Sequence, residues 1–488
     1  MSYRYHLAID IGASSGRHIL GHLEDGRIVL EEIYRFDNSQ IRKDGHDCWD
    51  HEALTRHVVA GLKACAAAGK IPATVGIDTW GVDFILLDES LQPCSDMVAY
   101  RDARTDGMDT EVEKILPFAE HYARTGIQKA IFNTVYQMAG LKREHPEQLE
   151  KAAHFLMVPD YLNFRLTGKI ANEYTDATTT ALVNAQEKTW DDEVLARLGL
   201  PRRIFGELSL PGTVLGGLQP AVRDEVGFDT TVILPAAHDT GSAYLAVPAR
   251  DDNAIYLSSG TWSIIGVENA APIATPESCA ANFSNEGGAW YRFRFLKNIM
   301  GLWMMQSVRR ELNGVEYVEG KGRAATEKAL AGLSGLKAPG EKWSFPDLIA
   351  AARGASSFAS VVDAADRRFF APESMAGAVC AACAESGQAV PASVGELVQC
   401  IYLSLAASYA KEAKLLAGIT GKTYTSLNIV GGGCQDTYLN ELTAKATGLE
   451  VFAGPIEGTS IGNLIVQFIH SGEFADLAAA RAAVAKSF

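Results

Sequence analysis

The features that constrain the fold of this chain most are two turns rich in glycine and hydroxyl residues. Each turn follows a short apolar strand. The first turn lies in residues 8–17, which read Ala-Ile-Asp-Ile-Gly-Ala-Ser-Ser-Gly-Arg. The second lies in residues 254–263, which read Ala-Ile-Tyr-Leu-Ser-Ser-Gly-Thr-Trp-Ser. Small residues after a strand let backbone N–H groups approach an anion that bulky side chains would block. One such turn is compatible with a simple hairpin tip, but two predict duplicated domains that hold one polyphosphate, and hence ATP chemistry.

Length and composition limit the class of protein. A chain of 488 residues predicts two domains, or three at most, and 47% hydrophobic with 21% charged residues is typical of soluble globular proteins. No uninterrupted apolar run approaches the roughly 20 residues of a membrane span, so we expect no membrane partner. A net charge of −15 argues against a nucleic-acid partner. The first residues carry no signal-peptide pattern, which favours a cytoplasmic protein. We expect either a monomer or a homodimer.

The order of predicted elements indicates an α/β fold with a mixed sheet. We expect strands in residues 5–11, 17–23, 27–36, 74–79 and 82–87, a helix in 51–68, and a helical insertion over 104–166. A short apolar strand from residue 232 predicts the start of a second α/β unit. It precedes a hairpin in 254–267, helices in 296–312, 396–416 and 436–447, and a strand in 425–430. A break in the pattern places the domain boundary in residues 244–253.

Asp10 ends the first strand, immediately before the Gly-Ala-Ser-Ser-Gly turn. A carboxylate beside a phosphate cradle suits a hydrated Mg²⁺ ion, which keeps several waters and takes one or two carboxylates. An aspartate that only caps the turn would give the same pattern. The N–H, O–H and guanidinium groups of residues 14–17 are expected to donate to phosphate oxygens. The Walker A pattern is absent.

In the second half, Thr261 is the hydroxyl residue that corresponds to the first turn. A later run, Gly431 to Gly433, joins a strand to a helix. Three glycines there remove side chains, so that a flat ring or a ribose could lie against the backbone. A tight strand-to-helix connection would use the same residues, and only the two phosphate turns make the run part of a nucleotide site.

Asp239 is the strongest candidate for catalysis, because it follows a short apolar strand and precedes small residues, and can therefore point into a cleft. Phosphoryl transfer to an alcohol needs an acceptor for the hydroxyl proton, and a carboxylate in line with the γ-phosphate can serve. The neighbouring His238 fits two roles equally, orienting a substrate or filling a half-buried structural position.

Residues 76–84 predict a hairpin that carries carboxylates and a tryptophan around a glycine turn. An aromatic face and carboxylates suit a sugar, so Trp80, Gly81 and Asp83 are candidate substrate residues. Solvated acids and a core tryptophan at an ordinary turn would look alike.

With these motifs in place, the chain resembles the FGGY carbohydrate kinases of the sugar kinase/Hsp70/actin superfamily. The resemblance implies an α/β protein with two RNase H-like domains around a central ATP/sugar cleft. Residues 1–246 would form the sugar-binding domain with the helical insertion, and residues 247–488 the nucleotide-binding domain. The motifs that carry the resemblance span nearly the whole chain, and they are residues 10–17, 76–83, 99–102, 159–161, 165–169, 174–180, 238–240, 256–263, 285–288, 297–303 and 429–435.

The resemblance also implies roles for single residues. Asp239 matches the family's catalytic base, Gly81 a sugar-contacting glycine, and His238 and Thr240 lie beside the sugar. Positions that match ATP contacts are Ala13, Ser14, Ser15, Gly16, Arg17, Thr261, Asn298, Gln306 and Gly432. The last helical pair, Asn298 and Gln306, is about two turns apart in the predicted helix, so we expect both on one face.

The activity implied is transfer of the γ-phosphoryl group of Mg-ATP to the O1 hydroxyl of a ketose, with L-rhamnulose expected. A related deoxyketose such as L-fuculose is the nearest alternative, since hydroxyl stereochemistry cannot be read from these motifs. An actin- or Hsp70-like ATPase module without a sugar is the alternative of a different class, because fold alone does not fix function.

Overall fold

The computed structural model describes residues 3–315 and 322–488, and these form two compact units. Unit 1 comprises residues 1–249, 267–296 and 457–488, and unit 2 comprises residues 250–266 and 297–456. A unit defined by contacts therefore takes segments from distant parts of the sequence. The predicted domain limits, 1–246 and 247–488, follow the duplication in the sequence instead and remain a prediction.

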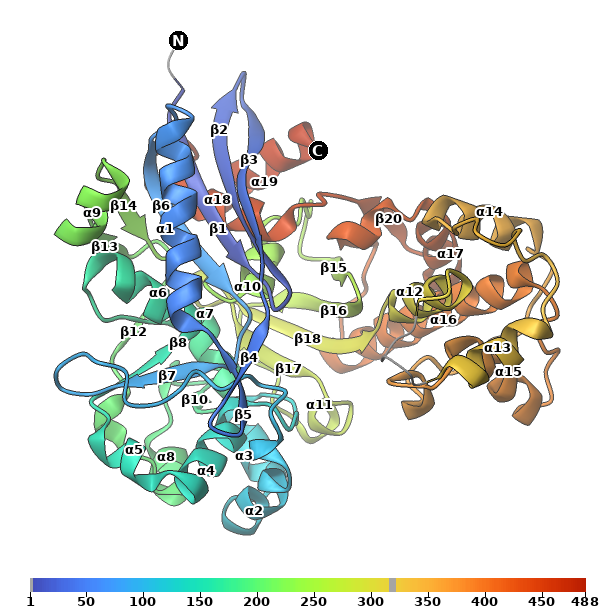
Figure 1. Ribbon diagram of the computed structural model, residues 1–488, viewed down its shortest axis with the longest axis horizontal. Helices are drawn as coiled ribbons and strands as arrows, with labels where there is room; N and C mark the ends of the chain where they lie inside the picture. Colours follow the sequence, from blue (N-terminus) through green and yellow to red (C-terminus); the bar gives the residue numbers. More distant parts are fainter. Residues whose placement is uncertain (1–2, 316–321) are drawn as a thin grey trace. The chain divides into compact units, whose positions relative to one another are not determined.

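Unit 1 is built on a mixed sheet with the strand order β13-β14-β6-β1-β2-β3 (Figure 1). The parallel strands are β1 (Tyr5–Ile11), β6 (Pro72–Thr79) and β14 (Thr231–Ile233), and the antiparallel strands are β2 (Ser15–Glu24), β3 (Arg27–Asp37) and β13 (Val214–Gly216). The central strands β1 and β6 are buried along almost their whole length, as expected for strands covered on both faces.

One helix of unit 1 was clearly marked in the sequence. Helix α1 (His51–Ala67) begins after Asp50, whose side chain accepts a hydrogen bond from the backbone N–H of Ala53. Gly69 follows its end with a left-handed φ of 68°. The prediction of a helix in residues 51–68 is thus confirmed.

The end of the chain belongs to unit 1. Helices α18 (Gly458–His470) and α19 (Leu477–Ser487) pack beside the N-terminal strands, and Figure 1 shows these red helices next to the blue strands β1 to β3. The amide of Asn463 donates to the carbonyl of Gly76 in β6, and that of Gln467 donates to the carbonyl of Leu7 in β1. The last residues of the sequence therefore support the strands that carry Asp10 and Asp78.

Smaller elements complete unit 1. The short strand pairs are β4 (Gln40–Lys43) with β5 (His46–Trp49), β7 (Phe84–Leu87) with β8 (His154–Met157), β9 (Asn172–Glu173) with β12 (Leu208–Ser209), and β10 (Val183–Asn184) with β11 (Thr189–Trp190). β17 (Ser284–Gly287) pairs antiparallel with β18 (Phe293–Met300) at one edge of the second six-stranded sheet. The helices are α2 (Met108–Ile115), α3 (Phe118–Thr125), α4 (Thr134–Glu144), α5 (Pro146–Lys151), α6 (Val158–Thr167), α7 (Tyr174–Ala177), α8 (Asp192–Leu198), α9 (Pro220–Val226), α10 (Asp239–Leu245) and α11 (Pro276–Ala280).

Unit 2 repeats the strand pattern of unit 1. β15 (Ala254–Ser259) pairs antiparallel with β16 (Trp262–Asn269) and parallel with β19 (Ser426–Val430), which is parallel to β20 (Glu450–Ala453). In unit 1, β1, β2, β6 and β14 have the same relations. The two glycine-hydroxyl turns thus sit at matching hairpins, as the sequence predicted.

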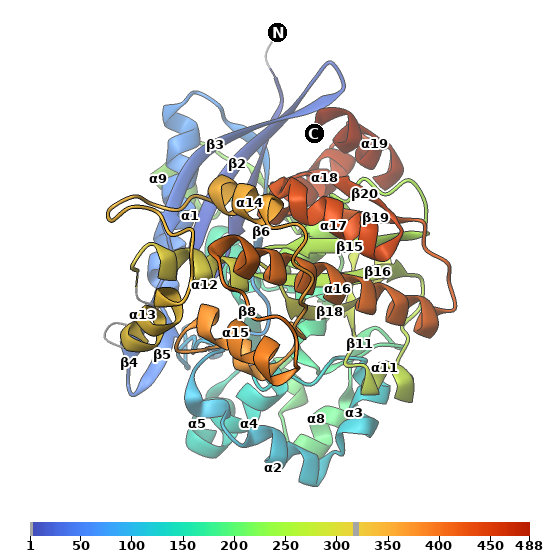
Figure 2. The same cartoon turned by 90° about the vertical axis from the view of Figure 1, so that its right-hand side faces the viewer.

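The helices of unit 2 lie together in Figure 2, where α16 runs beside α14, α15 and α17. They are α12 (Trp303–Leu312), α13 (Arg323–Ala331), α14 (Phe345–Gly354), α15 (Met375–Glu385), α16 (Val394–Thr420) and α17 (Thr437–Thr447). The predictions of helices in 396–416 and 436–447 and of a strand in 425–430 are confirmed. Within the described ranges, no helix has the length and apolar character needed to cross a bilayer.

Four sequence predictions need correction. Residues 296–312 are not one helix, because β18 continues to Met300 and α12 starts only at Trp303. Residues 76–84 are not a hairpin, since β6 pairs with β1 and β14 whereas β7 pairs with β8. The strand at residue 232 is β14, which belongs to the first sheet and does not open the second. The helical insertion also contains a strand, β8. In the last three cases the pairing partner lies far away in sequence, whereas in the first a strand that pairs with the nearby β17 was taken for the start of a helix.

Gly462 in α18 allows a close approach to α10, the helix that begins at Asp239. A Cβ atom at this position would lie 1.8 Å from the backbone oxygen of Ser242 and 2.5 Å from its carbonyl carbon. We expect Gly462→Ala to cost roughly 1–3 kcal/mol, as overpacking does, because a backbone cannot move aside like a side chain. Thermal unfolding should therefore begin at a lower temperature than in the parent protein.

Gly418→Ala is the matched control. Gly418 lies within helix α16, and its added Cβ would have no neighbour within 4 Å. Because alanine is a better helix former than glycine, this change should raise the free energy of unfolding by up to about 1 kcal/mol. If both substitutions shifted stability in the same direction, the packing explanation for Gly462 would be wrong.

Candidate active site

Asp239 is the first residue of α10, directly after the turn that leaves β14. Its Oδ1 accepts hydrogen bonds from the backbone N–H of Thr240 at 2.5 Å and from the Thr240 hydroxyl at 3.0 Å. The side chain remains 31% exposed. The carboxylate is thus held through one oxygen, while Oδ2 has no such bond to Thr240.

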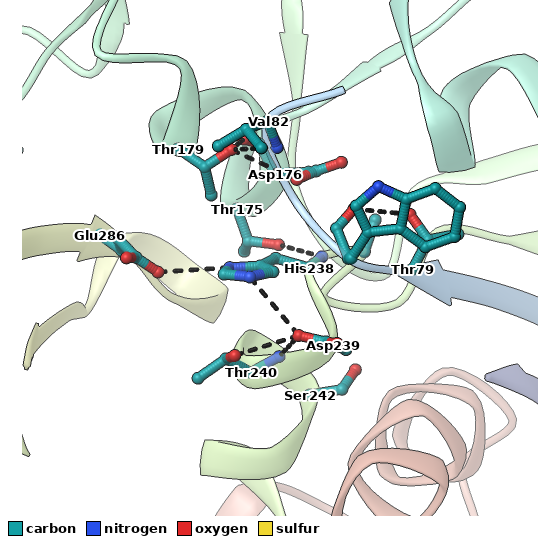
Figure 3. Close-up of polar contacts among 12 residues, drawn as sticks. Thr79, Val82, Thr175, Asp176, Thr179, His238, Asp239, Thr240, Ser242 and Glu286 are labelled. Atoms are coloured by element: carbon teal, nitrogen blue, oxygen red, sulfur yellow. Dashed lines mark hydrogen bonds and ion pairs between the residues drawn. The ribbon is translucent and has the colours of Figure 1, made fainter. Parts of the chain in front are cut away.

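The segment after β6 lies next to His238. The backbone N–H of Thr79 donates to the carbonyl of Ala237 at 2.9 Å, and Thr79 and His238 form a parallel bridge. Because β6 and β14 are parallel neighbours, their carboxyl ends open on the same edge of the sheet, where ligands bind in open α/β sheets. Trp80 and Gly81 follow Thr79 directly in the chain, and Figure 3 shows Thr79 and Val82 in the same region as His238 and Asp239. A common substrate site for these residues stays a prediction.

Gly81 is tightly enclosed. A Cβ atom there would lie 2.9 Å from the hydroxyl oxygen of Thr179 and 3.1 Å from Oδ1 of Asp176. The next residue, Val82, has a φ of 70°, a left-handed conformation that is strained for a β-branched side chain. Its N–H donates to Thr179 at 3.1 Å, and its carbonyl accepts from Thr134 at 2.6 Å. Strained backbone held by specific bonds is often found at functional sites.

Asp83 points into the protein and not toward a ligand. It is completely buried, and Oδ2 accepts hydrogen bonds from the indole N–H groups of Trp49 at 2.7 Å and Trp80 at 2.9 Å. Gln137 donates to Oδ1 at 2.9 Å. A direct bond from Asp83 or from the indole N–H of Trp80 to a sugar would require these bonds to break. Substrate binding by Asp83 and Trp80 stays a prediction, and the structure gives them a supporting position beneath Gly81.

Asp10 and Asp78 stand side by side where β1 and β6 end, because they are partners in the parallel register. Burial raises the pKa of Asp10 to about 6, although Arg17 opposes this and the charge of Asp239 adds to it. Burial and the nearby charge of Asp10 raise the pKa of Asp78 well above its ordinary value. Three acids, from the ends of β1, β6 and the β14 turn, therefore share one edge of the sheet and feel one another's charge.

The surroundings of Asp10 bear on the predicted magnesium site. Oδ2 of Asp10 contacts the guanidinium of Arg17 at 3.2 Å and the hydroxyl of Ser460 at 3.3 Å. Oδ1 of the neighbouring Asp78 is buried and finds no hydrogen-bond partner among the described residues. Within those residues no group of three or more histidine, cysteine or acidic side chains is arranged to hold a metal. The donor set fits an ion bound by one or two carboxylates and several waters, which is the usual coordination of Mg²⁺.

The first glycine-hydroxyl turn is the tip of the β1–β2 hairpin. The N–H of Gly12 donates to the carbonyl of Ser15 at 2.9 Å, and the amide of Asn38 donates to the carbonyl of Gly12 at 2.9 Å. Gly16 has a packing role, since a Cβ atom there would collide with the ring of Phe36 at 2.2 Å. Ser14 is the exposed residue of this turn, while Ala13 and Ser15 are partly exposed.

Arg17 is already engaged by acids. Besides Asp10, its guanidinium contacts Oε2 of Glu457 at 2.6 Å. A phosphate group would compete with these two carboxylates for the guanidinium, so its predicted contact with ATP remains a prediction.

In unit 2, the structure brings together two of the four residues predicted to contact ATP there. The hydroxyl of Thr261 donates to Oε1 of Gln306 at 3.1 Å, and the backbone N–H of Trp303 donates to the carbonyl of Thr261. Asn298 and Gln306 do not share a helical face, which corrects the sequence prediction: Asn298 is an exposed residue of strand β18, whereas Gln306 belongs to α12. Because a turn at Gly301 separates the strand from the helix, the spacing of Asn298 and Gln306 does not place their side chains on one helical face.

The three glycines after β19 have different roles. Added Cβ atoms at Gly431 and Gly433 would approach Ser259 at the end of β15, to 3.0 Å and 2.1 Å respectively. Only Gly432 faces open space, with no atom within 4 Å of an added Cβ. The run is therefore largely a close contact within unit 2, and a single glycine of it is free to face a ligand.

Buried acids lie behind the site, and the sequence did not indicate a role for any of them. Glu173 is the one that contacts the backbone before Asp239. Oε2 of Glu173 accepts hydrogen bonds from the hydroxyl of Thr175 at 2.6 Å and from the backbone N–H of Ala237 at 3.2 Å. Burial raises the pKa of Glu173 to about 7. The hydroxyl of Thr175 in turn accepts from the N–H of His238 at 3.3 Å. Glu173 thus holds the backbone just before Asp239, and the Tyr-Thr-Asp motif that follows it was the one hint in the sequence.

His238 lies between two acids. Its Nε2 is 3.4 Å from Oδ1 of Asp239, and its Nδ1 is 3.2 Å from Oε2 of Glu286 in β17 (Figure 3). Arg294 in β18 contacts both Glu286 and the histidine ring. Neither Glu286 nor Arg294 was singled out in the sequence, because nothing in a short strand indicates which distant ring it faces.

Solved structures show the same fold. The chain matches gluconate kinase from Lactobacillus acidophilus with a TM-score of 0.78 and 17% identity, over 98% of this chain and 92% of that one. It matches Plasmodium falciparum glycerol kinase with ADP with a TM-score of 0.77 and 13% identity, over 100% and 93% of the two chains. At these identities the likeness establishes the two-part α/β architecture.

Sequence comparison establishes the family. The N-terminal domain of the FGGY family of carbohydrate kinases matches residues 5–246, and the C-terminal domain of that family matches residues 255–471. The chain belongs to this family, and membership implies a sugar kinase that uses ATP. Curated relatives named rhamnulokinase include those of Halalkalibacterium halodurans, 47% identical over 99% of this chain and 97% of that one, and of Klebsiella pneumoniae subsp. pneumoniae, 42% identical over 98% and 92%.

Asp83 generates a prediction about pH. Burial raises its pKa to about 6, although Trp49, Trp80 and Gln137 donate to it. An unfolded chain has an aspartate pKa of about 3.9, so the folded state binds more protons between these values and loses stability as the pH rises through them. Between pH 4.5 and 7 this group should lower the free energy of unfolding by about 2 kcal/mol, and Asp83→Asn should lack that loss.

Urea unfolding of both proteins at the two pH values, followed by tryptophan fluorescence, measures the difference. The variant makes weaker hydrogen bonds at this position and is less stable at the outset. Only the change with pH in the gap between the two proteins' free energies of unfolding is therefore informative. A gap that stayed constant, or that widened toward neutral pH, would contradict the raised pKa.

Proposed function

We propose that this protein transfers the γ-phosphoryl group of ATP to the O1 hydroxyl of L-rhamnulose, giving L-rhamnulose 1-phosphate and ADP. The observation that carries the proposal is the carboxylate of Asp239, held by Thr240 through one oxygen and partly exposed beside the Gly81 segment. Support for L-rhamnulose as the sugar comes from the curated relatives named rhamnulokinase, which match this chain over nearly the whole length of both chains.

In this proposal, Asp239 accepts the proton of the sugar hydroxyl while the hydroxyl oxygen attacks the γ-phosphorus. Gly81, His238 and Thr240 line the sugar site, and the enclosed position of Gly81 keeps its backbone close to the ligand. A carboxylate suits this step because phosphoryl transfer needs only a weak base and correct placement of the attacking oxygen.

The nucleotide contacts are assigned by chemistry. Residues 13–17 offer N–H and hydroxyl donors to phosphate oxygens, and Thr261, Asn298, Gln306 and Gly432 form the nucleotide-binding set of unit 2. Asp10 would hold Mg²⁺ through water or directly, and the bound ion supplies positive charge to the phosphate oxygens.

We further assign the protein to the cytoplasm, as a monomer or homodimer, with sugar-binding and nucleotide-binding domains in residues 1–246 and 247–488.

Asp239→Asn tests the base. The amide keeps the shape of the side chain but cannot take up a proton, so phosphorylation should fall by at least about 100-fold, the lower range for general base catalysis. Stabilisation against heat by a non-hydrolysable ATP analogue should be retained, since Asp239 is not among the residues assigned to the nucleotide. Near-normal turnover in the variant would mean that another group accepts the proton.

A ketose screen tests the substrate. Coupled ADP production should be fastest with L-rhamnulose, and L-rhamnulose with the ATP analogue should raise the unfolding temperature more than either ligand alone, because ligands stabilise the state they bind. L-fuculose and D-xylulose are the comparison sugars. A clear preference for one of them would reject L-rhamnulose but keep the kinase, whereas ATP hydrolysis indifferent to every ketose would reject the kinase.

A further inference from the structure

The ring of His238 is placed between two carboxylates, one on each nitrogen. Asp239 faces Nε2 at 3.4 Å and Glu286 faces Nδ1 at 3.2 Å. The histidine and glutamate side chains are only 13% and 11% exposed. Figure 3 shows the ring lying between these two side chains.

Arg294 completes the group. Glu286 and Arg294 are direct cross-strand partners in the β17–β18 hairpin, and the arginine side chain is 1% exposed. Its Nη1 lies 3.0 Å from Oε2 of Glu286, and its Nη2 lies 3.2 Å from Nδ1 of His238. Nε and Nη2 also donate to the carbonyl of Gly287 at 3.1 and 3.0 Å, which fixes the guanidinium plane.

Nδ1 of His238 therefore faces both a donor and an acceptor. A guanidinium can only donate, so a neutral ring that accepts from Arg294 at Nδ1 carries its proton on Nε2. Oε2 of Glu286 has no hydrogen bond of good geometry among the described residues. It is free to accept from Nδ1–H when the ring is protonated, and Nε2 keeps its proton in that state as well.

The consequence falls on Asp239. In both charge states of the ring, Nε2–H is the ring donor nearest Oδ1, at an ion-pair distance of 3.4 Å, and Oδ1 also accepts the N–H and the hydroxyl of Thr240. Three donors around one carboxylate oxygen leave the other oxygen as the available acceptor.

We propose that Glu286 and Arg294 are positioning residues that keep Nε2–H of His238 on Oδ1 of Asp239 in both charge states of the ring, so that Oδ2 receives the proton of the sugar hydroxyl. The inference rests on the proposed function of Asp239 as the base. In the step itself the O1–H bond breaks and the proton passes to Oδ2. The O1 electron pair forms the bond to the γ-phosphorus, and the bond to the bridging oxygen breaks with its electrons on ADP.

Charged groups from three elements surround the ring. The charged groups that face His238 are Asp239 from α10, Glu286 from β17 and Arg294 from β18. Although burial alone would raise it, the pKa of Glu286 is lowered by Arg294 and His238, so Glu286 is a carboxylate over the assay range. Glu286 is therefore an ionised acceptor beside Nδ1, next to the Arg294 donor.

The first test is the ring proton of His238 in the intact protein. Long-range proton–nitrogen NMR spectra of protein with ¹⁵N-labelled histidine, assigned by the signal lost in His238→Gln, should show the neutral ring with its proton on Nε2. A neutral ring with the proton on Nδ1 would overturn the proposal, and this measurement depends on no kinetic variant.

The second test is Glu286→Gln. Loss of the carboxylate removes the acceptor beside Nδ1 and the ion pair that holds Arg294, so the ring of His238 should lose its fixed orientation toward Asp239. We expect kcat near neutral pH to fall about 10-fold, the smaller part of a general-base contribution, with KM for ATP changed less than twofold.

Asp191→Asn is the matched control, because Asp191 is a fully buried carboxylate of unit 1 that is paired with Arg124 at 2.8 Å. It should lower the unfolding temperature but leave kcat unchanged. If Glu286→Gln lost only stability, like this control, the positioning role would be rejected. If Asp239→Asn stayed active, the proposed base would fail first. An inactive Asp239→Asn together with an unchanged kcat in Glu286→Gln would reject only the present inference.

Discussion

The parallel pairing of β1 with β6, and of β6 with β14, is the constraint on which the candidate site depends. Parallel strands end on the same edge of a sheet, so the residues that follow them are brought together whatever their separation in sequence. Here that edge carries Asp10, Asp78 and the turn to Asp239. Buried acids so close repel one another, and this repulsion together with burial explains the raised pKa values of Asp10 and Asp78.

The repulsion is moderated by groups from the end of the chain. Ser460 donates to Asp10, and Asn463 donates to Asp78 at 2.6 Å, both from α18. Gln467, one turn further on, donates to the backbone of β1. One helix face thus supplies polar partners to the buried strands, while Gly462 on the same helix lets α10 approach. The C-terminal segment is in this sense part of the acid-bearing edge, and its helix α18 packs closely against α10.

Around Asp239, the polar groups form successive layers. Thr240 and His238 face the carboxylate, Glu286 and Arg294 face the histidine ring, and Glu173 holds the backbone at Ala237. Each layer restricts the orientation of the one before it. Such support is what a reaction catalysed mainly by placement and charge requires, because a small shift of the accepting oxygen weakens its alignment with the hydroxyl.

The sequence by itself determined the duplicated α/β pattern, the two hairpin turns, helix α1 and the place of Asp10 and Asp239 at the ends of apolar strands. These follow from local rules: hydrophobic periodicity, capping residues, and the need for small residues where a chain turns sharply. The family resemblance was likewise present in short motifs. Only the tertiary structure decided that Asp83 points inward to two indoles and that Asn298 is in a strand. It also decided that Glu286 and Arg294 contact the ring of His238, which is 56 positions before the arginine. Those facts depend on which strands pair and on which side chains meet across them, and long-range pairing is set by the packing of the whole unit, not by the residues next to each position.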